Sequence, residues 1–134
     1  MSFIPFLTFD GTAEKALNFY ADIFGATEVQ ILRYSDAPQE EKLPPSGRVM
    51  YGHIMLGEHC LMAYDSMPGM EFTPQASVAV NHPVETAEEG QRIFDRLAED
   101  GIVTMPYGPV FFSAAFGMLT DRFGTSWMIG VPTA

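Results

Sequence analysis

The feature that most constrains the fold is an internal repeat: Thr12–Glu14 recurs as Thr86–Glu88, 74 positions later. Apolar residues follow at matching positions of both copies, with Phe19, Tyr20 and Ile23 in the first and Ile93, Phe94 and Leu97 in the second. These positions share the spacing of one face of a helix, so both copies predict the same amphipathic helix at the same phase. A shared order of elements at a fixed offset indicates a duplicated module.

The first copy predicts a strand, a helix and three further strands. The apolar run Phe3–Phe9 is typical of a buried strand, and a helix follows, which Thr12 can cap and Gly25 can end. The polar segment Ser35–Gly47 contains three prolines and predicts a loop. The remaining strands are expected at residues 28–34, 48–56 and 59–65, and the module at about residues 1–66.

The second copy, at about residues 74–134, predicts the same order. A strand is expected at Ala76–Val80, and a helix that Thr86 caps ends near Gly101. A short strand at Ile102–Thr104, a loop containing proline and glycine, and a hairpin over Phe111–Val131 complete it. The sequence therefore predicts an α+β fold of two βαβββ modules in a single domain of 134 residues.

Hairpin geometry assigns the faces of the first sheet. If Gly57 and Glu58 form a two-residue turn, His59 pairs with Leu56, and Met62 pairs with His53. One face then holds Tyr51, His53, Met55, Cys60, Met62 and Tyr64. The other face, which is mostly aliphatic and suits packing against a helix, holds Met50, Gly52, Ile54, Leu56, His59, Leu61 and Ala63.

The final hairpin can be interpreted in the same way. A turn at Asp121–Gly124 that pairs Thr120 with Thr125 would place Met128 opposite Gly117. Met128 would then face a cavity with space beside it, and Trp127 would pack on the opposite side, under a helix.

Charge and cysteine content exclude several classes of protein. Acidic residues outnumber basic ones by 17 to 7, and the resulting net charge of −10 disfavours nucleic acids and anionic membranes as partners. There is no apolar run long enough to span a bilayer and no signal-peptide pattern at residues 1–5, so we expect a cytoplasmic protein. Cys60 is the only cysteine, which excludes an internal disulfide.

Four segments together resemble a known family: Pro5–Gly11, Asn18–Tyr20, Gly52–Gly57 and Thr120–Trp127. They resemble the PhnB-like branch of the vicinal oxygen chelate superfamily, which also contains glyoxalases, ring-cleaving dioxygenases and bleomycin-resistance proteins. The resemblance implies a glyoxalase-like fold, in which two modules with mixed, curled sheets enclose a cavity, and it implies a homodimer. Members of this branch are often described as 3-demethylubiquinone methyltransferases, but the sequence lacks the glycine-rich turn that a nucleoside cofactor usually needs.

The resemblance also implies where metal ligands would stand. Metal-using relatives take them from the first and last strand of each module, and here those positions fall near Phe3–Pro5, on Leu61 or Met62, near Gln75, and on Met128. None is a good ligand for a catalytic divalent ion. His53 and His59 point to opposite faces, and His53 with Cys60 makes an incomplete set. We therefore expect no metal and no cofactor.

The predicted ligand is a small, partly apolar or aromatic molecule. Aromatic rings, thioethers, a thiol and an imidazole make a polarizable wall with a few polar groups, as ligand pockets have. The predicted binding residues are Tyr51, His53, Met55, Cys60, Met62, Tyr64, Gln75 and Met128. No catalytic residue is assigned, and whether the chain is an enzyme stays open. Two alternatives remain: a metal-dependent glyoxalase or dioxygenase-type enzyme, and a dimeric interaction protein without a ligand.

Overall fold

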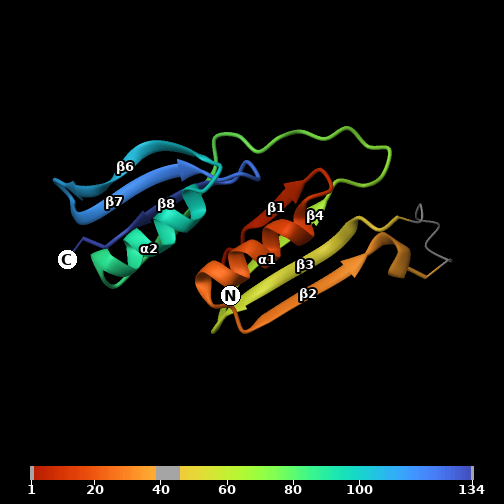
Figure 1. Cartoon of the computed structure of the whole chain (residues 1–134). Coiled ribbons are helices and arrows are strands. Elements are labelled where there is room, and N and C mark those ends of the chain that lie inside the picture. Colours follow the sequence, from red (N-terminus) through yellow and green to blue (C-terminus); the bar gives the residue numbers. More distant parts are fainter. Residues whose placement is uncertain (1, 39–45, 134) are drawn as a thin grey trace. The chain divides into compact units, whose positions relative to one another are not determined.

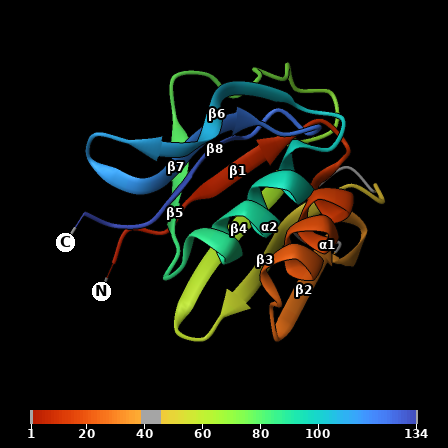
Figure 2. The ribbon, with the colours of Figure 1, turned by 60° about the vertical axis from the view of Figure 1, so that its left-hand side comes forward.

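The structure is a computed structural model that describes residues 2–38 and 46–133. It divides into two compact units, Met1–Pro74 and Gln75–Ala134. Part of the predicted proline-containing loop, residues 39–45, lies outside the described residues. In each unit one helix runs along one face of a four-stranded sheet (Figures 1 and 2).

The two units have the same order of elements and the same sheet topology. The first contains β1 (Phe6–Phe9), α1 (Ala13–Phe24), β2 (Glu28–Arg33), a 3-10 turn (Tyr34–Asp36), β3 (Val49–Leu56) and β4 (His59–Asp65). The second contains β5 (Ala79–Pro83), α2 (Ala87–Ala98), β6 (Ile102–Val110), β7 (Ser113–Thr120) and β8 (Ser126–Gly130). Their strand orders, β1-β4-β3-β2 and β5-β8-β7-β6, correspond element by element. In both sheets the first and last strands of the module are parallel neighbours, so the predicted α+β fold of two βαβββ modules is confirmed.

Each helix buries the apolar stripe that the repeat predicted. In α1 the stripe covers β3, and in α2 it covers β7. The stripe residues are almost fully buried: Ala16, Leu17, Tyr20 and Ile23 in α1, and Ile93, Phe94 and Leu97 in α2. Neither helix in the described part of the chain is long and apolar enough to cross a membrane.

The two helices begin differently. Thr86 Oγ1 accepts a hydrogen bond from the Glu89 amide, as the capping pattern predicted. The predicted cap of α1 by the Thr12 side chain is wrong, because that side chain makes no capping bond. The Asp65 carboxylate takes its place and accepts from the Ala13 amide at 3.0 Å.

The first predicted hairpin register is confirmed and the second is wrong by one residue. His53 pairs with Met62 and Leu56 with His59, as the two-residue turn requires. In the last hairpin Thr120 pairs with Ser126, because the loop contains five residues and Asp121 Oδ1 accepts from the Thr125 amide.

This change of register alters the surroundings of Met128. Its partner is Met118, while Gly117 lies on the helix side, where an added Cβ would stand 2.7 Å from Phe94 Cε2. Gly117 therefore leaves no space beside Met128, and the prediction that it does is wrong. Trp127 is 2% exposed and belongs to the core, as predicted.

Other strand boundaries differ where proline and glycine suggested loops. The strand expected at Ala76–Val80 is β5, which begins at Ala79 and continues to Pro83. The strand expected to end at Thr104 is β6, which continues through Pro106 and Gly108 to Val110. An edge strand such as β6 tolerates proline because one side of its backbone needs no sheet partner. The register of β6 against β7 is also irregular, so not every β6 residue has to pair with β7.

Candidate functional site

The candidate site lies on the face of the first sheet that is opposite α1, here called the open face. Pairing of His53 with Met62 and of Met55 with Cys60 places the predicted residues of β3 and β4 on that face. All six are half-buried: Tyr51, His53, Met55, Cys60, Met62 and Tyr64. Gly52 faces the helix instead, since a Cβ there would stand 2.6 Å from Leu17 Cδ1. The predicted division of β3 and β4 into two faces holds for these residues.

His53 is held by partners at both ring nitrogens. Its Nδ1 lies 3.0 Å from Tyr51 Oη, and its Nε2 lies 3.3 Å from Glu28 Oε2. Glu28 comes from β2, where Gln30 pairs with His53. Glu28 is absent from the predicted residues because only the register of β2 against β3 places it beside His53.

An aromatic group extends this face toward β1. The Phe6 ring lies edge-on to Tyr64, with centroids 5.0 Å apart, and edge-on to Tyr51 at 6.1 Å. Edge-to-face arrangements of this kind are the ones that aromatic quadrupoles favour. Phe6 is nevertheless 48% exposed, so much of its ring is available for contact with a ligand.

A pocket of about 470 Å³ opens beside this aromatic group. It is lined by Phe6, Tyr34, Met50, Tyr64 and Met67, of which only Tyr64 had been predicted as a binding residue. Its lining is mostly apolar, as is usual for sites that bind small molecules.

Met50 was assigned to the helix side, and that assignment is wrong. Leu32 pairs with Tyr51 and Arg33 pairs with Val49, which leaves Met50 as an extra residue in β3. A bulge of this kind breaks the alternation of side chains, so simple parity fails at that position.

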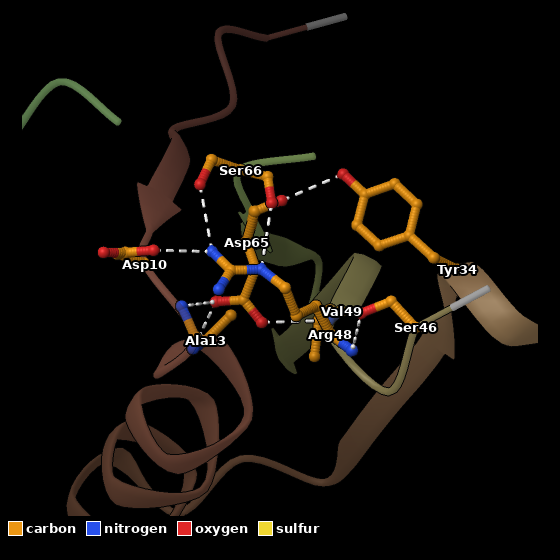
Figure 3. A network of polar contacts seen from close by, with 9 residues as sticks. Asp10, Ala13, Tyr34, Ser46, Arg48, Val49, Asp65 and Ser66 are labelled. Carbon is orange, nitrogen blue, oxygen red and sulfur yellow. Dashed lines mark hydrogen bonds and ion pairs between the residues drawn. The ribbon is translucent and has the colours of Figure 1, made fainter. Parts of the chain in front are cut away.

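A buried carboxylate lies in the polar network that holds Tyr34, one of the residues lining the pocket (Figure 3). Asp65 is 1% exposed, and its Oδ1 accepts from the amides of Gly11 and Ala13 at 2.8 and 3.0 Å. Its Oδ2 accepts from the Val49 amide at 2.9 Å, and its backbone carbonyl accepts from the Tyr34 hydroxyl at 2.9 Å. Asp65 therefore ties together β4, the start of α1, β3 and the ring of Tyr34.

Arg48 also belongs to this network, with its guanidinium between Asp10 and Ser66 (Figure 3). Its Nε donates to the Ser66 carbonyl at 3.1 Å, and its Nη2 donates to Ser66 Oγ at 3.0 Å. The same Nη2 forms an ion pair with Asp10 at 2.8 Å. These partners make Arg48 part of the scaffold beside the pocket.

The donor set of the open face does not fit a catalytic divalent ion. Within residues 2–38 and 46–133, no group of three or more His, Cys, Asp or Glu side chains could hold a metal. Both ring nitrogens of His53 already have partners. Burial, with a smaller contribution from Glu28, raises the pKa of the Cys60 thiol, which disfavours the thiolate that binds metals.

Gln75 and Met128 belong to the second unit. The β5 residue that pairs with Met128 is Asn81. Gln75 precedes β5 and donates from Nε2 to Thr125 Oγ1 at 3.1 Å. A contribution of Gln75 and Met128 to ligand binding stays a prediction.

Comparison with solved structures identifies the fold. A glyoxalase/bleomycin resistance/dioxygenase family enzyme from Burkholderia phytofirmans PsJN has a TM-score of 0.61 at 15% identity, over 96% of this chain and 95% of that one. At that identity the likeness concerns the fold alone, which is the glyoxalase-like fold that the resemblance implied.

Closer relatives narrow the class to one family. The family model described as 3-demethylubiquinone-9 3-methyltransferase matches residues 1–130, and the chain belongs to this PhnB-like family. Protein PA1353 from Pseudomonas aeruginosa is 32% identical with a TM-score of 0.89, over 98% of both chains. A PhnB protein from Bacillus cereus is 31% identical with a TM-score of 0.78, over 98% of this chain and 99% of that one.

Proposed function

We propose that this chain binds a small, partly apolar or aromatic molecule at the open face, without the metal ion of other glyoxalase-superfamily proteins. The observation that carries the proposal is the pocket of about 470 Å³ lined by aromatic rings and methionines. Its volume lies in the range of small-molecule sites, and its walls suit a ring-shaped ligand.

The pocket wall favours an aromatic ligand over an aliphatic one. Exposed edges and faces of Phe6 and Tyr64 offer the quadrupole contacts that a second ring prefers. The thioethers of Met50 and Met67 adapt to irregular shapes and make favourable contacts with rings. The Tyr34 hydroxyl donates to the Asp65 carbonyl, so this ring contributes mainly its apolar surface.

The family description names a methyl transfer to a demethylubiquinone, and such a ring is one member of the proposed ligand class. We do not assign the methyl transfer to this chain, because its sequence lacks a nucleotide-binding glycine turn between a strand and a helix. The ring itself is a suitable probe, and S-adenosylmethionine belongs in the same panel as a test of the family description.

Calorimetric titration with a panel of monocyclic phenols, quinols and aliphatic analogues tests this proposal. Phe6→Ala should weaken binding of the aromatic members about tenfold, because it removes a ring contact from the pocket. Phe111→Ala is the matched control, since Phe111 is fully exposed at 100% and belongs to the other unit. The proposal fails if no aromatic compound binds, or if both variants bind as the unmodified chain does.

Metal independence has its own test. Elemental analysis of the purified protein should find no stoichiometric metal, and added manganese, zinc or iron(II) should leave the melting temperature unchanged. Stabilisation by one of these ions that His53→Ala abolishes would overturn this part of the proposal.

We also propose that the chain acts in the cytoplasm as a homodimer. The support is the family likeness, in which the cavity is commonly completed by dimerisation. Light scattering should give twice the chain mass of 14.8 kDa, and the mass of a single chain would refute the dimer.

A further inference from the structure

Three side chains on the open face form a continuous polar chain across two strands. The carboxylate of Glu28 on β2 lies 3.3 Å from Nε2 of His53 on β3, and Nδ1 of His53 lies 3.0 Å from the Tyr51 hydroxyl. The imidazole is less exposed than its carboxylate partner, with 18% of its side chain accessible against 49% for Glu28. The order carboxylate, imidazole, hydroxyl is the order in which proteins activate a hydroxyl group.

The partners of His53 determine which nitrogen of the neutral ring carries the proton. An ionised carboxylate only accepts hydrogen bonds, so Glu28 requires the proton on Nε2. Nδ1 then presents its lone pair, and the Tyr51 hydroxyl donates to it. In this arrangement the lone pairs of the tyrosine oxygen can accept a proton from another group.

Tyr51 lies next to Phe6, which lines the pocket. The Phe6 ring lines the pocket and lies edge-on to Tyr51, with centroids 6.1 Å apart. Burial, with a smaller contribution from the charge of Glu28, raises the pKa of the Cys60 thiol. This thiol therefore adds no competing negative charge to the open face. A ring that binds against Phe6 can therefore direct a substituent toward the Tyr51 oxygen.

We infer that Glu28, His53 and Tyr51 form a proton relay that ionises a phenol or enol bound against Phe6. The ligand O–H bond breaks and its proton joins the Tyr51 oxygen, while the proton of Tyr51 moves to His53 Nδ1. The ligand becomes a phenolate or enolate, and His53 becomes an imidazolium whose Nε2–H faces the Glu28 carboxylate. Tyr51 contacts the ligand, whereas His53 and Glu28 act through it. The inference rests on the proposed function, because it requires a ligand at the open face.

Two matched probes separate binding from ionisation. p-Nitrophenol carries an acidic O–H and absorbs differently once ionised, whereas p-nitroanisole has the same ring without that proton. Each is titrated against the intact chain at a pH where free p-nitrophenol is mostly protonated. We expect the bound phenol to show the phenolate band and to bind about tenfold more tightly than the ether, as a charge-assisted hydrogen bond would give.

Variants of the relay identify the groups responsible. Tyr51→Phe and His53→Gln should still bind p-nitroanisole but lose the phenolate band and the preference for the phenol. Glu28→Gln should reduce the band, because the imidazolium loses its negative partner. Glu58→Gln removes the same charge from an exposed turn residue and should behave as the unmodified chain.

The outcomes separate this inference from the function on which it rests. Equal binding of both probes without a phenolate band would overturn the relay and leave the binding function standing. A phenolate band that survives His53→Gln would also overturn the relay. Failure of both probes to bind would count against the proposed function and the relay together.

Discussion

The most informative structural perturbation is Asp65→Asn, which keeps the shape of a buried side chain and changes its hydrogen bonding. Asp65 is 1% exposed, and its two oxygens accept three backbone amides, two at Oδ1 and one at Oδ2. An asparagine must place its NH2 group at one of these positions. The less costly choice keeps the oxygen toward Gly11 and Ala13 and turns the NH2 group toward the Val49 amide.

The expected loss of folding stability follows from these three hydrogen bonds. An unpaired buried amide at Val49 costs about 1–3 kcal/mol, and the two remaining bonds each weaken by about 1 kcal/mol when their acceptor loses its charge. Asparagine also avoids the desolvation of a buried charge, which offsets part of the loss. We expect a net destabilisation of about 2–4 kcal/mol, which is a large share of the stability of a typical domain.

Urea unfolding followed by circular dichroism measures this difference. The midpoint should fall while the slope with denaturant stays constant. Asp10→Asn is the matched control, because its side chain is 60% exposed and its ion pair with Arg48 should contribute at most about 1 kcal/mol. If Asp65→Asn destabilises the chain no more than Asp10→Asn does, the argument that Asp65 holds this end of the unit together is wrong.

Three further predictions concern other parts of the chain. Gly117→Ala should destabilise the chain by about 1–3 kcal/mol, because the new Cβ meets the Phe94 ring. Gly108→Ala should cost much less, because there is open space at that position. Urea unfolding compares the two variants, and equal losses of stability would contradict the packing argument. Burial lowers the pKa of His82, an effect that Glu89 partly offsets, so the unfolded chain binds a proton first as the pH falls through the ordinary histidine range. The free energy of unfolding should therefore decrease as the pH falls from 8 through the ordinary histidine range. His82→Gln should lose less of it over the same pH interval, and an equal pH dependence of the two proteins would refute this. Burial raises the pKa of Cys60, so a thiolate-specific disulfide reagent at neutral pH should modify it slowly in the folded chain and rapidly in urea, and equal rates would refute the assignment.

The parts of the fold that the sequence predicted well are those set by local periodicity. The repeated stripe that includes Tyr20 and Phe94 located both helices, and a two-residue turn at Gly57 fixed the first hairpin register. The errors arose where side chains override local patterns. The Asp121 carboxylate lengthens the last turn by accepting backbone amides, and this shifts the pairing of β7 with β8 by one residue.

The candidate site was predicted only in part for a similar reason. Alternation along β3 and β4 correctly grouped His53 with Tyr51, because both strands are regular there. The bulge at Met50 and the register of β2 depend on pairing between strands that local sequence does not encode. Glu28 and Met50 were therefore missed, although one completes the polar chain and the other lines the pocket.

The two modules have kept one backbone topology while their sheets have acquired different chemistry. On the sheet face opposite α2, Met118 pairs with Met128, and the hydroxyl groups of Thr120 and Ser126 lie 3.3 Å apart. This face has no imidazole or carboxylate among these four side chains, whereas the matching face of the first sheet carries His53 beside the Glu28 carboxylate. Met118 on β7 is the position that matches His53 on β3, since each pairs with a methionine of the last strand. Met118→His would not create a second relay, because the neighbouring β6 carries no carboxylate that could take the place of Glu28.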